Sequence, residues 1–133
     1  MAINNALRDD PKLLTTLGPA ARTSTVNGTT LDLATFKFPS LHVIVGTITD
    51  GTHTLDPEEA PDNGSGAPGS WTNIAAADLE GGAFAVLATD VNQSRVYLGT
   101  KRFVRVNVTV AGASTGGIYA VGAELVRGAS SDL

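Results

Sequence analysis

The sequence predicts an all-β protein: an antiparallel β-sandwich of jelly-roll or related topology, with a short N-terminal arm. Three observations predict this class. Of 133 residues, 42 % are hydrophobic but only 5 % are aromatic, so the core must consist mainly of aliphatic side chains. The 15 glycines favour many turns. Short stretches rich in β-branched residues alternate apolar with polar side chains, without a long helical pattern or an internal repeat.

The length fits a single domain. We expect residues 1–22 to form an N-terminal arm or lid, residues 23–128 to form one β-sandwich domain, and residues 129–133 to form a C-terminal tail. These boundaries follow the change near residue 22 from a Leu-rich, charged segment to period-two alternation.

The N-terminal arm carries four leucines among charged residues: Leu7, Leu13, Leu14 and Leu17. Pro11 is placed to begin a short helical turn, and Gly18-Pro19 to end it. So short a helix is not stable alone in water. The arm therefore either packs as a lid on its own domain or docks on a neighbouring subunit.

Eight strands are predicted from the alternation. They are Thr23–Val26, Thr29–Asp32, Leu41–Thr49, Thr52–Leu55, Phe84–Ala88, Arg95–Leu98, Phe103–Ala111 and Ile118–Arg127.

The dipeptide Asp50-Gly51 between two of these strands favours a β-hairpin, since a type I′ turn needs positive φ at both central residues. This turn would pair Thr49 with Thr52 and Ile48 with His53.

A second hairpin is predicted for the last two strands, because each has one apolar face. Matching those faces pairs Val110 with Tyr119, Val108 with Val121, Val106 with Ala123 and Val104 with Leu125. The same register places Arg105 opposite Glu124 as a cross-strand ion pair.

A long exposed loop is predicted over residues 56–70, which read DPEEAPDNGSGAPGS and contain no apolar residue larger than Ala. Its acidic residues resemble a calcium loop in composition only, because their spacing does not follow the EF-hand order. Trp71 follows directly and either caps the core or anchors an interface.

Composition argues against several classes of function. The net charge is −4 and the sequence pI is 4.9, which disfavours a protein that binds nucleic acid directly. There is no cysteine for catalysis or zinc binding. No apolar stretch is long enough for a membrane span, and the first residues lack a signal-peptide pattern, so we expect a soluble, non-exported protein.

No catalytic motif was found, and we expect neither an enzyme nor a bound cofactor or metal. His42 and His53 are the two histidines, and their spacing matches no zinc motif. A Ser-His-Asp arrangement remains open, although the Gly-x-Ser-x-Gly elbow is absent. The glycine-rich residues 112–117 lack the lysine of a phosphate-binding loop and fit a turn.

Charge is unevenly distributed along the chain. Between Lys37 and Arg95 there are eight acidic residues and no Lys or Arg, and Arg95, Lys101, Arg102 and Arg105 then follow together. An acidic and a basic region can meet copies of the same protein or another patterned surface, although the segregation can also be accidental.

Two stretches of the chain combine turns with short apolar runs: residues 49–54 (TDGTHT) with 71–81 (WTNIAAADLEG), and residues 97–106 (YLGTKRFVRV) followed by 112–119 (GASTGGIY). Both stretches resemble small virion proteins of tailed bacteriophages. The chain is similar in this way to capsid decoration, or cement, proteins over about residues 40–128.

The resemblance implies a structural protein on the outer surface of the virion capsid, made in the host cytoplasm. It would bridge major capsid subunits and help the shell resist internal pressure. Many weak symmetric contacts suit that role. Candidate capsid contacts are the four leucines of the arm with Arg95, Lys101, Arg102 and Arg105; candidates for contact between copies, in a dimer or trimer, are Glu58, Glu59, Asp62 and Trp71.

Three other functions remain open. A head–tail connector or tail-tube protein would also be small, β-rich and oligomeric. A carbohydrate-binding surface module would share the sandwich, but one Trp and two Tyr offer few stacking rings. A small hydrolase would need a site centred on a histidine.

Overall fold

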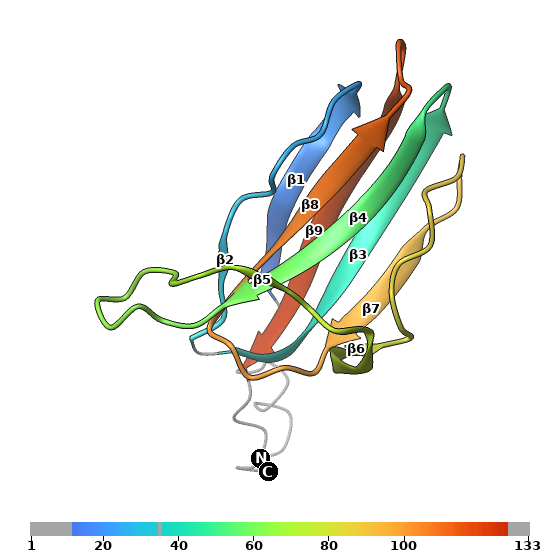
Figure 1. Cartoon of the computed structure of the whole chain (residues 1–133). Coiled ribbons are helices and arrows are strands. Elements are labelled where there is room, and N and C mark those ends of the chain that lie inside the picture. Colours follow the sequence, from blue (N-terminus) through green and yellow to red (C-terminus); the bar gives the residue numbers. More distant parts are fainter. Residues whose placement is uncertain (1–11, 35, 128–133) are drawn as a thin grey trace, which may run out of the picture.

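The computed structural model describes residues 12–34 and 36–127 and is a sandwich of two antiparallel sheets, as the sequence predicts (Figure 1). Sheet A has the strand order β1-β9-β3-β7-β6, with β1 (Lys12–Arg22), β9 (Gly117–Arg127), β3 (Phe36–Ile48), β7 (Gln93–Tyr97) and β6 (Leu79–Glu80). Sheet B has the order β2-β8-β4-β5, with β2 (Leu31–Asp32), β8 (Phe103–Ala111), β4 (Thr52–Ala60) and β5 (Thr72–Asn73).

A 3₁₀ turn, η1 (Ala76–Asp78), lies between β5 and β6. Within the described ranges, no helix is long and apolar enough to cross a membrane.

The core lies between the two sheets and is made of the inward side chains of alternate strand positions. Val104, Val106 and Val108 of β8 are fully buried and so are Leu41 and Val43 of β3. The predicted valine alternation is therefore confirmed as the core face of β8.

The turn at Asp50-Gly51 does not form the predicted hairpin. It connects β3 in sheet A to β4 in sheet B, so the expected pairs Thr49–Thr52 and Ile48–His53 are wrong. Gly51 has φ +87°, but Asp50 is not among the residues with positive φ, so the turn is not type I′. The two strands face each other across the core as an arch.

The second predicted hairpin is wrong for the same reason. β8 pairs with β4, placing Val108 beside Leu55, whereas β9 pairs with β1 and β3, placing Val121 beside Val43. Both apolar faces point into the core, but from opposite sheets. Arg105 consequently lies opposite Glu58 and not opposite Glu124.

The two arches stand side by side at one end of the sandwich, and Asp50 joins them (Figure 1). Its carboxylate accepts hydrogen bonds from the backbone N–H groups of Ser114, Thr115 and Gly116, at 3.1, 3.1 and 2.6 Å. These N–H donors, led by that of Gly116, hold the pKa of Asp50 below its ordinary value.

The helical turn expected in the N-terminal arm is also wrong, because residues 12–22 form the edge strand β1. β1 pairs with β9 along its length, with irregularities on both sides of Leu17. Thr16 fastens this edge to sheet B: its hydroxyl donates to the carbonyl of Thr29 at 2.7 Å and accepts from the N–H of Val106 at 3.2 Å.

Other strand boundaries differ in detail from the prediction. The stretch Thr23–Val26 forms only a bridge, from Val26 to Val108, and Phe84–Ala88 is not a strand. The exposed loop begins after Ala60 and not at residue 56, since β4 continues through Pro57. The carbonyl of Pro57 accepts a hydrogen bond from the N–H of Ile74, just after β5, on the side of β4 that faces away from β8. In an antiparallel strand the nitrogen of a residue points to the same side as its carbonyl, so the Pro57 nitrogen, which carries no hydrogen, also faces away from β8.

Candidate binding surfaces

Glu58, Arg105 and Trp71 form one cluster on the outward face of sheet B, defined here as the Glu58 cluster with Asn107. Arg105 Nε and the Asn107 amide donate to Glu58 Oε1, at 2.8 and 2.9 Å. The Arg105 guanidinium lies 4.3 Å from the centre of the Trp71 ring. Arg105, which was expected to contact the capsid, thus contacts Glu58 and Trp71 of its own chain, which were expected to contact other copies.

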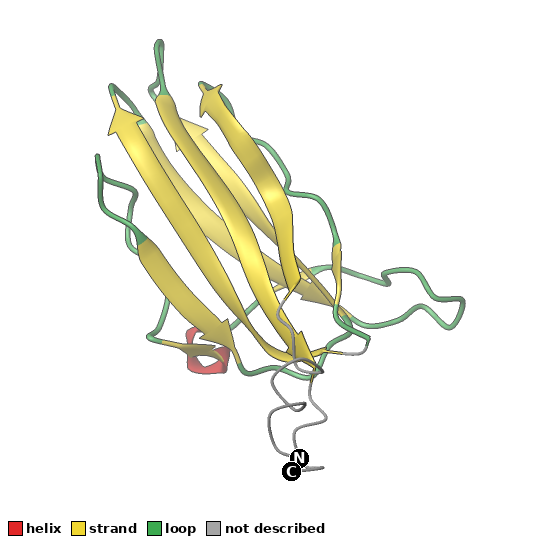
Figure 2. Cartoon of the chain, turned by 180° about the vertical axis from the view of Figure 1, so that it is seen from behind, coloured by secondary structure: helices red, strands yellow, loops and turns green. Residues whose placement is uncertain are grey.

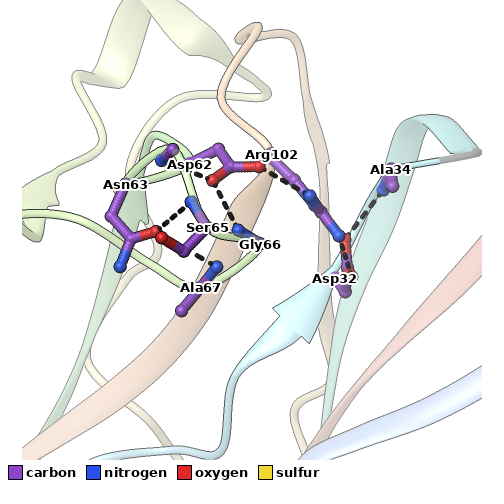
Figure 3. Close-up of polar contacts among 9 residues, drawn as sticks. Asp32, Ala34, Asp62, Asn63, Ser65, Gly66, Ala67 and Arg102 are labelled. Carbon is purple, nitrogen blue, oxygen red and sulfur yellow. Dashed lines mark hydrogen bonds and ion pairs between the residues drawn. The ribbon is translucent and has the colours of Figure 1, made fainter.

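Arg102 binds two carboxylates at the margin of sheet B (Figure 3). Its guanidinium donates to Asp32 at 2.9 Å from two nitrogens and to Asp62 at 2.7 Å. These bonds raise the pKa of Arg102, and the hydrogen bond from Arg102 is the main cause that holds the pKa of Asp32 below its ordinary value. Arg102 therefore joins β2, the start of β8 and the loop after β4.

The loop after β4 is ordered by its own side chains (Figure 3). Asp62 Oδ1 accepts from the N–H groups of Gly64 and Gly66 at 2.8 and 3.0 Å, and Asn63 Oδ1 accepts from Ser65 at 2.7 Å. The N–H groups of Gly66 and then Gly64 are the main causes that lower the pKa of Asp62. The side chains of Asp62 and Asn63 therefore stabilise a turn.

The remaining residues that were predicted as contacts, two basic and one acidic, lie in different environments. Arg95 donates to the carbonyl oxygens of Gly82 and Ala83, at 2.9 and 3.1 Å, and its guanidinium lies over the ring of Phe84. Lys101 is exposed. Glu59 accepts from the hydroxyl of Tyr97 at 2.5 Å.

The leucines of the predicted arm also separate. Leu7 lies outside the described residues. Leu13 is 77 % exposed on the outward face of sheet A, whereas Leu14 is half-buried against the core and Leu17 is buried in it at 3 %. Leu17 is thus a core residue. Among the arm leucines that the structure describes, Leu13 is the one whose side chain is open to a partner.

A group that the sequence did not predict lies on the outward face of sheet A: His42, Ser94 and Glu124 on three neighbouring strands. His42 Nδ1 is 2.6 Å from Ser94 Oγ, and His42 Nε2 is 3.7 Å from Glu124 Oε1. All three residue types of a hydrolase triad are present, but the carboxylate is beyond hydrogen-bond distance. The cross-strand pair His42–Ser94 explains the contact, and only the register could have revealed it.

His53 is fully buried, and both ring nitrogens have partners. Nδ1 lies 2.9 Å from the hydroxyl of Tyr119 and Nε2 lies 3.0 Å from the carbonyl of Asp50. It is a satisfied core histidine. Across residues 12–34 and 36–127, no group of three or more His, Asp or Glu side chains is placed to hold a metal ion.

An apolar cleft lies at the end of the sandwich opposite the arches, and we call it the basal cleft. It has a volume of about 630 Å³, and its lining includes Leu33, Phe36, Phe38, Pro39, Leu98 and Lys101. Phe38 is 63 % exposed and has φ +51°, which is costly for a bulky residue. β1 begins and β9 ends at this end of the molecule (Figure 1).

The outward face of sheet A contains a second apolar depression, of about 280 Å³. Ala120 and Gly122 of β9 lie in it beside the exposed side chains of Leu13 and Ile44. Figure 2 shows this sheet toward the viewer, with the connecting loops gathered at its ends and sides.

The described residues therefore form an antiparallel two-sheet sandwich that carries the basal cleft and the depression on sheet A. No protein-family model matches the chain, and no curated protein matches it. One similar solved structure is the SPBc2 prophage-derived protein YomS, with 16 % identity, a TM-score of 0.44 and coverage of 89 % of this chain and 94 % of that chain.

A second similar structure is that of the infectious bursal disease virus Gx strain, with 10 % identity and a TM-score of 0.48. The match covers 92 % of this chain but 35 % of the viral chain, so the protein spans about a third of that length. Likenesses this distant carry no argument about function.

Proposed function

We propose that the protein is a structural component of a tailed-phage virion. It binds the outside of the capsid and stabilises the shell by bridging major capsid subunits, after synthesis in the host cytoplasm. Its partners are the major capsid protein and other copies of itself, with no direct contact to nucleic acid or membrane. It does so without catalysis.

The observation that carries this proposal is the basal cleft. Phe38 is held exposed in a left-handed backbone conformation, and Lys101 and Arg102 add positive charge to a lining that is mainly apolar. This chemistry suits an apolar side chain next to a carboxylate on a capsid subunit. The exposed Phe38 ring would then be buried on binding.

Paired charges on sheet B support a structural role in a second way. Arg102 and Arg105 are already occupied by Asp32, Asp62 and Glu58, so they stabilise the sandwich. We therefore assign the capsid contact to the basal cleft with Lys101, and not to the whole basic edge.

The two similar solved structures come from a prophage-derived protein and a virus, but they are too distant to carry the proposal. The carbohydrate-binding alternative has little geometric support. Tyr97 and Tyr119 are buried at 1 % exposure, and Arg105 covers one face of Trp71. These rings are therefore poorly placed for stacking on a sugar.

The test is co-sedimentation with capsids that lack this protein. Phe38→Asn removes the ring while keeping a residue that tolerates positive φ. We expect it to weaken capsid binding by about tenfold or more, as for an aromatic anchor. Val86→Asn, at a 54 % exposed position outside the cleft, is the matched control and should bind as the wild type does.

Unchanged binding by the Phe38→Asn protein would exclude the basal cleft as the contact. Counting copies per virion tests the role itself. Hundreds of copies spread over the capsid support decoration, whereas a single ring at one vertex supports the connector alternative and overturns the proposal.

A further inference from the structure

On the outward face of sheet A, three successive cross-strand pairs of β3 and β9, and the two neighbouring residues that follow them at a register irregularity, each join one large and one small residue. His42 of β3 pairs with Gly122 of β9, and Ile44 pairs with Ala120. The order is reversed at both ends of this run. The end pairs are Ser40 with Glu124 and Gly46 beside Ile118.

The Gly46–Ile118 neighbourhood follows from the backbone. A Cβ added to Gly46 would lie 3.7 Å from the Cβ of Ile118. Along the face, the large residue of each pair therefore lies first on β9, then twice on β3, and then on β9 again. The small residue opposite each large one forms a shallow site on the other strand.

We propose that a second copy of this chain packs on this face, related by a two-fold axis that runs parallel to the strands between β3 and β9. Such an axis keeps every residue at its own height and places β9 of one copy over β3 of the other. Ile44 then faces the partner's Ala120, and Ile118 faces the partner's Gly46.

This symmetry makes the face complementary to itself, since His42 also faces the partner's Gly122. Glu124 faces the partner's Ser40. Packed sheets are rotated by about 30° relative to each other, so the match is best at the two central pairs. The side chain of Ile44 enters the depression that contains the partner's Ala120.

The other two-fold axis, perpendicular to the strands, gives a poor fit. It would place Ile44 over the partner's His42 and Ile118 over the partner's Glu124, large against large. It would also place Ala120 over the partner's Gly122, which leaves a gap. The arrangement of sizes therefore selects the first axis.

The exposure and charge of the face also favour a second copy. Ile44, Ile118 and Leu13 are 64, 52 and 77 % exposed on a face whose four central pairs contain one imidazole and one carboxylate. The strands β1, β9, β3 and β7 have 11, 11, 13 and 5 residues, and at about 3.3 Å per residue and about 4.8 Å between strands they span roughly 600 Å². Two such faces reach the lower limit of specific interfaces, about 1,200 Å² in total. We expect a dimer of moderate affinity.

This dimer would present both basal clefts at the same end, because its strands run in the same direction in the two copies. Two capsid subunits could then be held by one dimer. That consequence rests on the proposed function, whereas the dimer itself does not.

Sedimentation velocity on the full chain tests the dimer. At up to about 100 µM, a range suited to a moderate interface, the wild type should sediment with twice the chain mass of 13.6 kDa. Ile44→Lys should sediment as a monomer, because it places an ammonium group against the partner's Ala120. Val86→Lys, a similarly exposed control outside the face, should remain dimeric.

A monomeric wild type, or a dimer that survives Ile44→Lys, would overturn the proposal. If the wild type is monomeric and Ile44→Lys instead loses capsid binding, the face contacts the shell and the self-association is wrong. Unchanged capsid binding by Phe38→Asn, in a protein that still forms the dimer, would count against the basal cleft alone.

Cross-linking tests the direction of the axis in a chain that has no cysteine. A Glu124→Cys variant treated with a short bismaleimide should form covalent dimers, since the two positions 124 lie at the same height. With the perpendicular axis they would be about 20 Å apart, the rise of six residues. In that case a mixture of Glu124→Cys and Ile118→Cys would cross-link instead, and the proposed axis would be wrong.

Discussion

The outward faces of the two sheets differ although their strands are joined by tight turns. Sheet B presents Glu58, Arg105, Asn107 and Trp71 in mutual contact, with Arg102 and its two carboxylates at the margin. Sheet A presents Ile44, Ile118 and Leu13 beside Ala120 and Gly122.

This difference shows which of the two outward faces has its side chains satisfied by contacts within a single chain. The charges of sheet B satisfy each other, so this face needs no partner. The apolar side chains of sheet A remain in water unless another molecule covers them. The comparison predicts that changes on sheet B alter folding, whereas changes on sheet A alter association.

The largest effect is expected for Glu58→Ala on sheet B. The substitution leaves Arg105 and the amide of Asn107 without their acceptor. The side chains of the ion pair that it breaks, Arg105 and Glu58, are only 21 and 19 % exposed. We expect a loss of about 2 kcal/mol of unfolding free energy, measured by urea denaturation.

Glu80→Ala, at the exposed position of β6, is the control and should unfold like the wild type. Arg105→Ala should in addition shift the fluorescence of Trp71, the one tryptophan, by uncovering its ring. If Glu58→Ala unfolds at the wild-type urea concentration, the Glu58 cluster does not stabilise sheet B.

A smaller effect, dependent on pH, is expected for Arg102→Ala. The folded-state pKa values of Asp32 and Asp62 are lowered, so their contribution to stability is present above about pH 5 and is lost as pH falls below their folded pKa values. Without Arg102, Asp32 loses the main cause of its shift, whereas Asp62 keeps the loop N–H groups.

The difference in unfolding free energy between the wild type and Arg102→Ala should therefore shrink between pH 7 and pH 3. Urea titrations across that range measure it. A difference that stays constant with pH would show that the carboxylates are not coupled to folding through Arg102.

The smallest effect on folding is expected for Ile44→Ser on sheet A. Its side chain is 64 % exposed in one chain, so unfolding free energy measured at concentrations where the protein is monomeric should change by less than about 0.5 kcal/mol. A loss of several times this amount would mean that the face contributes to the monomer, and the contrast between the sheets would fail.

Strand positions could be predicted from the sequence far better than strand partners. The alternation from Val104 to Val110 identifies one buried face, and β8 begins and ends where expected. The same alternation fits a strand paired in a hairpin and a strand facing another across the core. The turn at Asp50-Gly51 did not distinguish these cases, because only Gly51 required positive φ.

The candidate surfaces were predictable only in part for the same reason. The sequence indicated Arg105, Glu58 and Trp71 as interaction residues, but their mutual contact depends on β4 lying beside β8. Phe38 and the outward residues of sheet A carry no local motif. Their exposure follows from the irregular start of β3 and from the pairing of β3 with β9.

The position of β9 has a consequence for biosynthesis. β9 is the last of the described strands in sequence, yet it lies between β1 and β3 in the interior of sheet A. During translation β1 and β3 therefore emerge long before the strand that joins them. Folding that depends on such distant pairing is slow and leaves strand edges open to other chains. A nascent chain of this protein should thus reach its protease-resistant state only after β9 has emerged from the ribosome.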